Sequence, residues 1–206
     1  MDCFDWDRLQ TGNVQHEPFD YMVVRNVVRA AALKDIRKDF PSISKPGLFP
    51  LSEVTAGPAF NSFVEEIQYG ELTAMLGRKF DMDLSERPQM ITVRGRCRAR
   101  DGKIHTDTFE KILTVLIYLN DEWTAGGGNL RILRGPHDID DVIAEVPPNG
   151  GTMIAFKPSP RSWHGHKPFE GERRYVMVNW MKNADVAARE ILRHRVSAAA
   201  KRIFTT

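Results

Sequence analysis

Residues 111–120 read KILTVLIYLN, an almost unbroken run of apolar and β-branched residues with polar residues at its two ends. This composition over so short a length is typical of a buried β-strand. The run is also much shorter than the ~20 apolar residues that a membrane-spanning helix needs. We therefore expect a strand here and no membrane-spanning segment.

The sequence on both sides of this run has a similar character. Short β-rich segments alternate with clusters of Gly, Pro and Asp, a pattern typical of a β-sandwich or barrel rather than a parallel sheet. We expect this β-sandwich core to span residues 89–182. Its other segments are ITVRGRCRA (91–99), NLRILRG (129–135), DVIAEV (141–146), GTMIAF (151–156) and RRYVMVNWM (173–181).

The region before the sandwich, residues 1–88, has mainly helical features. Asn26 is expected to cap a helix, and Pro58 suits the first turn of another that ends near Gly70. Helical spacing then continues to about Phe80, and a short strand is expected over residues 19–24. The first helix would bury Leu33, Ile36 and Phe40.

Residues 183–206 are expected to form a helix that covers the sandwich. Asn183 would cap it, and its buried face would carry Leu192, Val196, Ala199 and Ile203. A chain of 206 residues without internal repeats suits one domain. The fold class is therefore α+β: a helical support layer, a β core and a C-terminal helix.

Composition excludes several classes of protein. The net charge of +2 is too small to make nucleic acid the default partner. Two cysteines, Cys3 and Cys97, are too few for a disulfide framework or a thiolate zinc site. The N-terminal residues MDCFDWDRLQ contain no apolar signal region, so we expect a cytoplasmic protein.

Three residues of the β region suggest a metal site. His105 and Asp107 are two apart, which on a strand would send both side chains to one face, and His164 follows Asp107 by 57 residues. Two imidazoles and one carboxylate make a facial triad that suits non-haem Fe(II) and leaves open positions. An isolated His-x-Asp pair is more often only a solvated pair or a cap, so the motif needs support from the rest of the sequence.

Arginines follow the third of these residues. Arg173 and Arg174 begin the segment RRYVMVNWM, and a guanidinium there could bind the far carboxylate of a dicarboxylic cosubstrate. Adjacent residues of a strand point to opposite faces, so at most one of the two faces a pocket.

The ordered set of motifs from residue 89 to residue 181 resembles the iron(II)/2-oxoglutarate-dependent dioxygenases, and among them the prolyl 4-hydroxylase-like branch. The set consists of HTD (105–107), KILTVLIYLNDEW (111–123), GGGNLRIL (126–133), PPNGGTMIAF (147–156) and SWHGHKPFEGERR (162–174), with NW after it. The resemblance implies a double-stranded β-helix, or jelly-roll, core.

The resemblance also implies residue roles. His105, Asp107 and His164 would bind Fe(II). Arg174, ten residues after His164, is favoured over Arg173 for the cosubstrate carboxylate, although the Gly171-x-Arg173 frame favours the other. Further implied contacts in the cofactor pocket are Tyr118, Leu116, Leu130 and Trp180, while His166 would be a neighbouring or surface histidine, or exchange roles with His164.

The implied reaction is hydroxylation of an unactivated C–H bond, with succinate and CO₂ as coproducts. Its cofactors would be Fe(II), 2-oxoglutarate as cosubstrate and O₂, with ascorbate as a candidate reductant. A small molecule or a peptidyl residue would be the substrate, and its identity and the oligomeric state stay open.

One departure from the family concerns the stretch 94–100. Relatives often carry a tyrosine about ten residues before the first metal histidine, whereas here the alternating Arg94, Arg96, Arg98 and Arg100 would share one strand face. If that face looks into the site, the substrate is anionic.

Three alternative functions are less consistent with the sequence. A cupin-like metalloenzyme would need a further His or Glu ligand, and a non-catalytic jelly-roll binding module would not need an intact triad. A nucleic-acid demethylase lacks support, because the Arg-rich motif of that branch is missing after His164.

Overall fold

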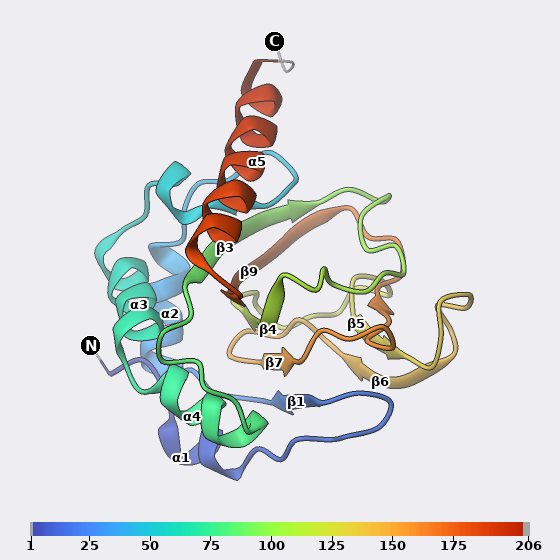
Figure 1. Ribbon diagram of the computed structural model, residues 1–206. Coiled ribbons are helices and arrows are strands. Elements are labelled where there is room, and N and C mark those ends of the chain that lie inside the picture. Colours follow the sequence, from blue (N-terminus) through green and yellow to red (C-terminus); the bar gives the residue numbers. More distant parts are fainter. Residues whose placement is uncertain (1, 204–206) are drawn as a thin grey trace.

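Two antiparallel β-sheets and a layer of helices make up the fold (Figure 1). The computed structural model describes residues 2–203, with side chains to residue 196. The elements in chain order are α1 (Trp6–Thr11), β1 (Tyr21–Val24), α2 (Ala30–Lys38), β2 (Phe49–Pro50), the 3₁₀ helix η1 (Leu51–Glu53), α3 (Pro58–Tyr69), α4 (Leu72–Phe80), β3 (Gln89–Cys97), β4 (Lys111–Tyr118), β5 (Leu130–Leu133), β6 (Val142–Val146), β7 (Met153–Phe156), β8 (His164–Gly165), β9 (Gly171–Met181) and α5 (Ala184–Ile203).

The larger sheet has the strand order β1-β7-β4-β9-β3-β2, and the smaller sheet has the order β6-β5-β8. The run 111–120 indeed forms a strand, β4, between β7 and β9. The two outermost strands of the larger sheet, β1 and β2, come from the region 1–88. This region is therefore not only a helical support, because Tyr21 pairs with Phe156 and Phe49 pairs with Val93.

The larger sheet has an apolar core on each face. Leu113, Val115 and Ile117 of β4 pack with the helices on one face, and Leu116 and Tyr118 lie on the other. This alternation follows from the twofold period of a strand. Strand β9 divides its side chains in the same way, with Val176, Val178 and Trp180 toward the helices and Tyr175 and Met177 away from them.

The helices α2, α3 and α4 cover the first of these faces (Figure 1). As expected, Pro58 stands at the start of α3, and Gly70 follows its last residue. The expectation for Asn26 is wrong: α2 begins at Ala30 after Arg29, and Asn26 has a φ of 57° in the turn before it. The turn uses the left-handed conformation that asparagine tolerates better than most residues.

Helix α5 begins as the sequence predicts, because the backbone N–H of Val186 donates to Asn183 Oδ1 at 3.0 Å. Its expected buried face is wrong. Val186 and Ala187 pack on Met90 and Met181, whereas Leu192 and Val196 are 60% and 63% exposed. The helix turns a different side to the rest of the molecule: Glu190, Arg193 and His194 line a cavity, and Leu192 and Val196 lie on the opposite side of the helix. The side chains of Ala199 and Ile203 lie outside the described residues.

Among residues 2–203, no helix is both long enough and apolar enough to cross a bilayer.

Candidate metal centre

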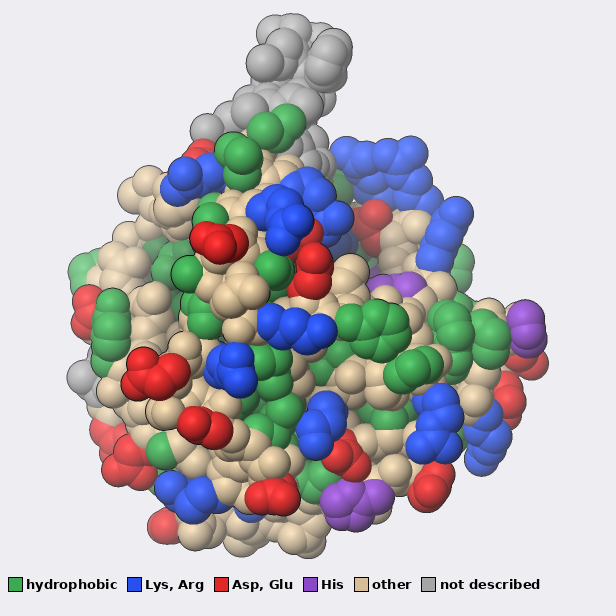
Figure 2. All heavy atoms as spheres, in the orientation of Figure 1, with side chains coloured by type: hydrophobic (Ala, Val, Ile, Leu, Met, Phe, Trp, Pro, Cys, Tyr) green, Lys and Arg blue, Asp and Glu red, His purple; other side chains and the backbone are tan. Residues whose placement is uncertain are grey.

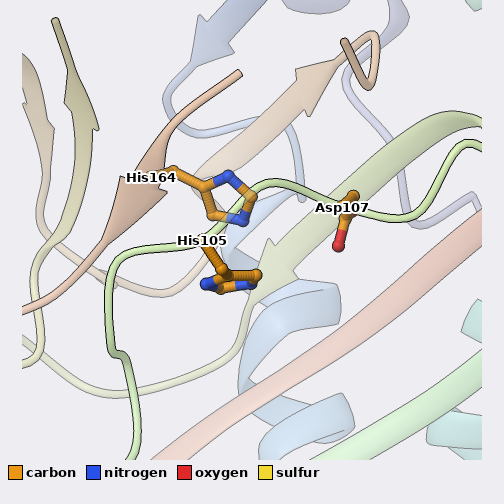
Figure 3. Close-up of side chains that lie close together, drawn as sticks. All are labelled: His105, Asp107 and His164. Atoms are coloured by element: carbon orange, nitrogen blue, oxygen red, sulfur yellow. The ribbon is translucent and has the colours of Figure 1, made fainter. Parts of the chain in front are cut away.

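His105, Asp107 and His164 come together in the structure (Figure 3). Their ligand atoms all lie within 4.8 Å of one another. His164 is in β8. His105 and Asp107 lie in the connection between β3 and β4, whereas their spacing favours a strand. One antiparallel bridge joins the two segments, because the backbone N–H of each histidine donates to the backbone carbonyl oxygen of the other at 3.0 Å.

Main-chain carbonyl groups hold both imidazoles. His105 Nδ1 lies 2.8 Å from the Lys103 carbonyl oxygen, and His164 Nδ1 lies 2.8 Å from that of Ser162. A carbonyl oxygen only accepts hydrogen bonds, so Nδ1 carries a proton in each ring and Nε2 is the nitrogen left to face a metal ion. Burial, and then the neighbouring His105, lower the pKa of His164 to about 4, so this ring is neutral at pH 7. Both rings thus present a nitrogen that can coordinate a metal ion.

The carboxylate of Asp107 is also held in place. Lys111 Nζ lies 2.8 Å from Oδ1, and the Thr114 hydroxyl donates to Oδ2 at 2.6 Å. Burial alone would raise the pKa of Asp107, but the Lys111 charge and the hydrogen bonds outweigh it and keep the pKa below its ordinary value. Asp107 is therefore ionised at neutral pH. Sequence reasoning missed both donors, although Thr114 is the one hydroxyl in the apolar run 112–117.

This donor set fits a divalent transition metal. Two imidazoles and one carboxylate on one side leave the remaining positions of an octahedral ion open. Within the described part of the chain, no further His, Cys, Asp or Glu joins this group. The cupin-like alternative therefore lacks the additional ligand that it requires.

The three residues line a cavity of about 310 Å³. Apolar side chains of the second core, among them Leu116, Leu130 and Phe156, form part of its wall. Leu116 and Leu130 thus lie where the resemblance implied. Helix α5 contributes Glu190, Arg193 and His194 to the lining. Figure 2 shows histidine atoms recessed between basic and apolar side chains on this face of the molecule.

Trp180 does not lie in this cavity. It is fully buried on the helix-covered face of the larger sheet. Side chains alternate along β9, so Trp180 points away from the face on which Tyr175 and Met177 line the cavity. The implied contact between Trp180 and a cofactor is wrong.

Of the two adjacent arginines, Arg173 lines the cavity. Its side chain is 2% exposed; Nε donates to the Gly128 carbonyl oxygen at 2.8 Å and Nη2 to the Tyr118 hydroxyl at 3.2 Å. The guanidinium also lies 5.2 Å from the ring centroids of both Tyr118 and Tyr175. Among the described residues it has no carboxylate partner, so a buried positive charge faces the cavity without a counter-ion from the protein.

The expectation that Arg174 rather than Arg173 faces the cavity is wrong. The Arg174 guanidinium lies on the opposite face of β9, where it pairs with Glu172 at 3.0 Å and packs over the Phe40 ring. Residues 173, 175 and 177 share one face of the strand, so the twofold period selects Arg173 once Tyr175 and Met177 are known to face the cavity.

The four alternating arginines do not share a face. The register of β3 and β9 shifts between Arg94, which pairs with Tyr175, and Arg96, which pairs with Glu172. Tyr175 and Glu172 are three residues apart and point to opposite faces, so Arg94 and Arg96 do as well. Arg94 lines the cavity and pairs with Asp101 at 2.7 Å. The shared face that motivated an anionic substrate is therefore not formed.

His166 also lines the cavity, but its ring is not part of the ligand group. Its Nδ1 lies 2.8 Å from the Lys167 carbonyl oxygen. Burial, and next the charge of Arg173, lower its pKa to about 4. Gly102 leaves room for this ring, because a Cβ there would lie 2.3 Å from it. His166 thus lies beside the candidate ligand group, to which His164 and not His166 belongs.

Residues 96–182, which include the three ligand candidates and Arg173, match the 2OG-Fe(II) oxygenase superfamily. This region therefore resembles a 2OG-Fe(II) oxygenase domain, and its His-Asp-His group fits the Fe(II) and 2-oxoglutarate chemistry of that superfamily.

Solved structures show the same fold in the prolyl 4-hydroxylase-like branch. A prolyl-4-hydroxylase from Pseudomonas putida aligns with a TM-score of 0.54 at 16% identity, over 86% of this chain and 92% of its own. The viral collagen prolyl hydroxylase of Paramecium bursaria Chlorella virus-1, in its 2OG complex, gives 0.55 at 15% identity, over 80% and 96%. HygX from Streptomyces hygroscopicus, with nickel and 2-oxoglutarate bound, gives 0.50 at 13% identity, over 78% and 82%. No curated protein sequence matches the chain.

Proposed function

We propose that this protein hydroxylates an unactivated C–H bond of an organic substrate and converts 2-oxoglutarate and O₂ into succinate and CO₂. One observation carries the proposal: a His-Asp-His ligand group and a buried guanidinium without a carboxylate partner line the same cavity. The first suits a divalent metal, and the second suits the free carboxylate of a dicarboxylic acid.

The cavity residues would have two separate roles, metal binding and carboxylate binding. His105, Asp107 and His164 would hold Fe(II), which with 2-oxoglutarate and O₂ supplies the oxidising power for the hydroxylation. Arg173 would bind the C5 carboxylate of 2-oxoglutarate through its planar guanidinium, with the Tyr118 hydroxyl beside it. Burial raises the pKa of Tyr118 to about 12, so its hydroxyl stays protonated and can donate to that carboxylate.

The walls of the cavity assist this binding. Leu116, Leu130 and Phe156 keep water away from the charged groups, and electrostatic attraction is stronger where water is excluded. The orientation of Arg173 is fixed in advance by the Gly128 carbonyl group and two tyrosine rings. Such preorganisation lowers the entropic cost of binding the cosubstrate.

For the substrate, we propose a small molecule or a peptidyl residue. The names of two structural neighbours, both prolyl hydroxylases, make peptidyl proline the first substrate to test. We also propose a cytoplasmic location, in keeping with Cys3 and Cys97, which are buried and not joined by a disulfide.

The test uses the purified chain with Fe(II), 2-oxoglutarate, ascorbate and pooled candidate substrates. Succinate formation and a product heavier by one oxygen atom are expected, and both should be absent in Asp107→Ala. Anaerobic addition of Fe(II) and 2-oxoglutarate should give a weak visible absorption band that the variant lacks. A wild-type protein that binds neither Fe(II) nor 2-oxoglutarate would refute the proposed function.

A further inference from the structure

Two polar side chains interrupt the apolar interior of the larger sheet. Thr114 of β4 and Asn179 of β9 lie directly opposite each other and are 1% and 0% exposed. Burying a hydroxyl and an amide costs free energy unless they are hydrogen-bonded, and Val or Leu would fill such positions at lower cost. The pair therefore calls for an explanation beyond packing.

The contacts of Thr114 connect this pair to the metal centre. Its Oγ1 lies 2.6 Å from Asp107 Oδ2 and 3.0 Å from Asn179 Oδ1. A threonine hydroxyl has only one hydrogen, so it cannot donate to both oxygens. The distance to Asp107 is the shorter of the two, so the hydrogen belongs to the bond with Asp107.

Asn179 must then donate to Thr114. Its Nδ2 is buried and has no partner within the described part of the chain. Turning the amide over exchanges Oδ1 and Nδ2, which lets Nδ2 donate to Thr114 Oγ1. The result is a directed chain of hydrogen bonds, from the Asn179 amide to the Thr114 hydroxyl and from there to the Asp107 carboxylate.

We propose that Thr114 and Asn179 are positioning residues that hold the Asp107 carboxylate in the orientation in which it binds the metal. The inference rests on the metal site of the proposed function. Each ligand histidine is fixed by a main-chain carbonyl group, and Asp107, which comes from a loop, receives its support from this pair instead. Partners of this kind orient a ligand and raise its affinity for the metal.

Lys111 holds the other carboxylate oxygen, but in a different way. It is a flexible ammonium group at the cavity wall, whereas Thr114 is a short side chain fixed in the middle of a strand. A rigid donor defines a direction, so Thr114 is the better residue for orienting Asp107.

The test compares Thr114→Val, which keeps the shape and removes the hydroxyl, with Thr92→Val as a matched control. Thr92 is a fully buried threonine of β3, and its hydroxyl has no partner among the described residues. Calorimetric titration of the metal-free chain with Ni²⁺ alone measures affinity without turnover. We expect binding about 10–100-fold weaker in Thr114→Val, recovery in Thr114→Ser, and no change in Thr92→Val.

Asn179→Leu provides a second variant. It should weaken Ni²⁺ binding by a smaller factor, and should add nothing to Thr114→Val, because Asn179 acts through Thr114. Wild-type affinity in folded Thr114→Val would overturn the inference while leaving the proposed function intact. If Thr114→Val does not fold, unchanged affinity in Asn179→Leu overturns it instead. A wild-type chain that does not bind Ni²⁺ would refute the metal site itself, and the inference with it.

Discussion

Arg173 and Arg174 are neighbours in sequence with the same side chain, yet they lie in opposite environments. One is buried beside Tyr118 in the cavity, and the other pairs with Glu172 and covers Phe40 on the far face of the sheet. The alternation of side chains along β9 causes this difference. The pair therefore offers a matched comparison of one substitution at two places.

Arg173→Gln should raise the KM for 2-oxoglutarate about 10–100-fold, because a hydrogen bond to a charged group contributes roughly 1.5–3 kcal/mol and ~1.4 kcal/mol is a factor of ten. Arg174→Gln should change it less than about twofold, since an exposed ion pair contributes little. Steady-state kinetics of 2-oxoglutarate consumption measures both. Equal effects of the two substitutions would contradict the assignment of Arg173.

Gly102 gives a prediction about stability. Its φ is +81°, and an added Cβ would lie 2.3 Å from the His166 ring. Gly102→Ala should therefore destabilise the fold by about 1–3 kcal/mol, through backbone strain and the displaced ring. Gly126→Ala is the control, because nothing lies within 4 Å of a Cβ there. Denaturant unfolding of both variants is the measurement, and equal midpoints would show that the ring adapts freely.

At the scale of the elements, α5 shows that helical periodicity alone does not locate a buried face. Leu192 and Val196 have the spacing of a packed stripe, but that stripe lies on the side of α5 opposite to Glu190, Arg193 and His194, which face the cavity. The packing of α5 on the sheet involves Val186 and Ala187, near its start.

This leads to a prediction for single substitutions in α5. Val186→Ala should cost about 1–2 kcal/mol of unfolding free energy, because two buried carbon atoms are lost. Leu192→Ser should stay within about 0.5 kcal/mol of the wild type, as exposed positions usually do. Chemical denaturation compares the two. A large loss in Leu192→Ser would mean that this face of α5 is covered in solution.

The sequence predicted the strands well where their period was clear, as in β4, β7 and β9. It also selected, by type and order, the three side chains that the structure brings together as candidate metal ligands. Other features depend on tertiary contacts that no local pattern records. The register shift between Arg94 and Arg96 reverses the direction of Arg96. The strands β1 and β2 pair with segments far along the chain, as Tyr21 does with Phe156 and Phe49 with Val93. No sequence pattern distinguishes Thr114 and Asn179 from ordinary strand residues, because their roles depend on contacts between distant segments.

For the whole molecule, the metal centre links parts of the chain that are distant in sequence. A ligand that binds only the folded state adds its binding free energy to stability. Ni²⁺ at a hundred times its dissociation constant should therefore stabilise the wild type by about 2.7 kcal/mol. The expected rise in Tm should be reversed by a chelator and absent in Asp107→Ala. A similar rise in that variant would indicate binding elsewhere.

The bridge between His105 and His164 has a mechanical consequence. Strand β8 is only two residues long, so few backbone hydrogen bonds secure the segment that carries His164. An ion bound to all three ligands would cross-link the chain across the long loop between Asp107 and His164, and cross-links that close long loops restrict the chain most. The segment around β8 should consequently be the first part of the domain to exchange its amide hydrogens faster when the ion is withdrawn. In this way the enzyme's chemistry and the local rigidity of its fold depend on the same few atoms.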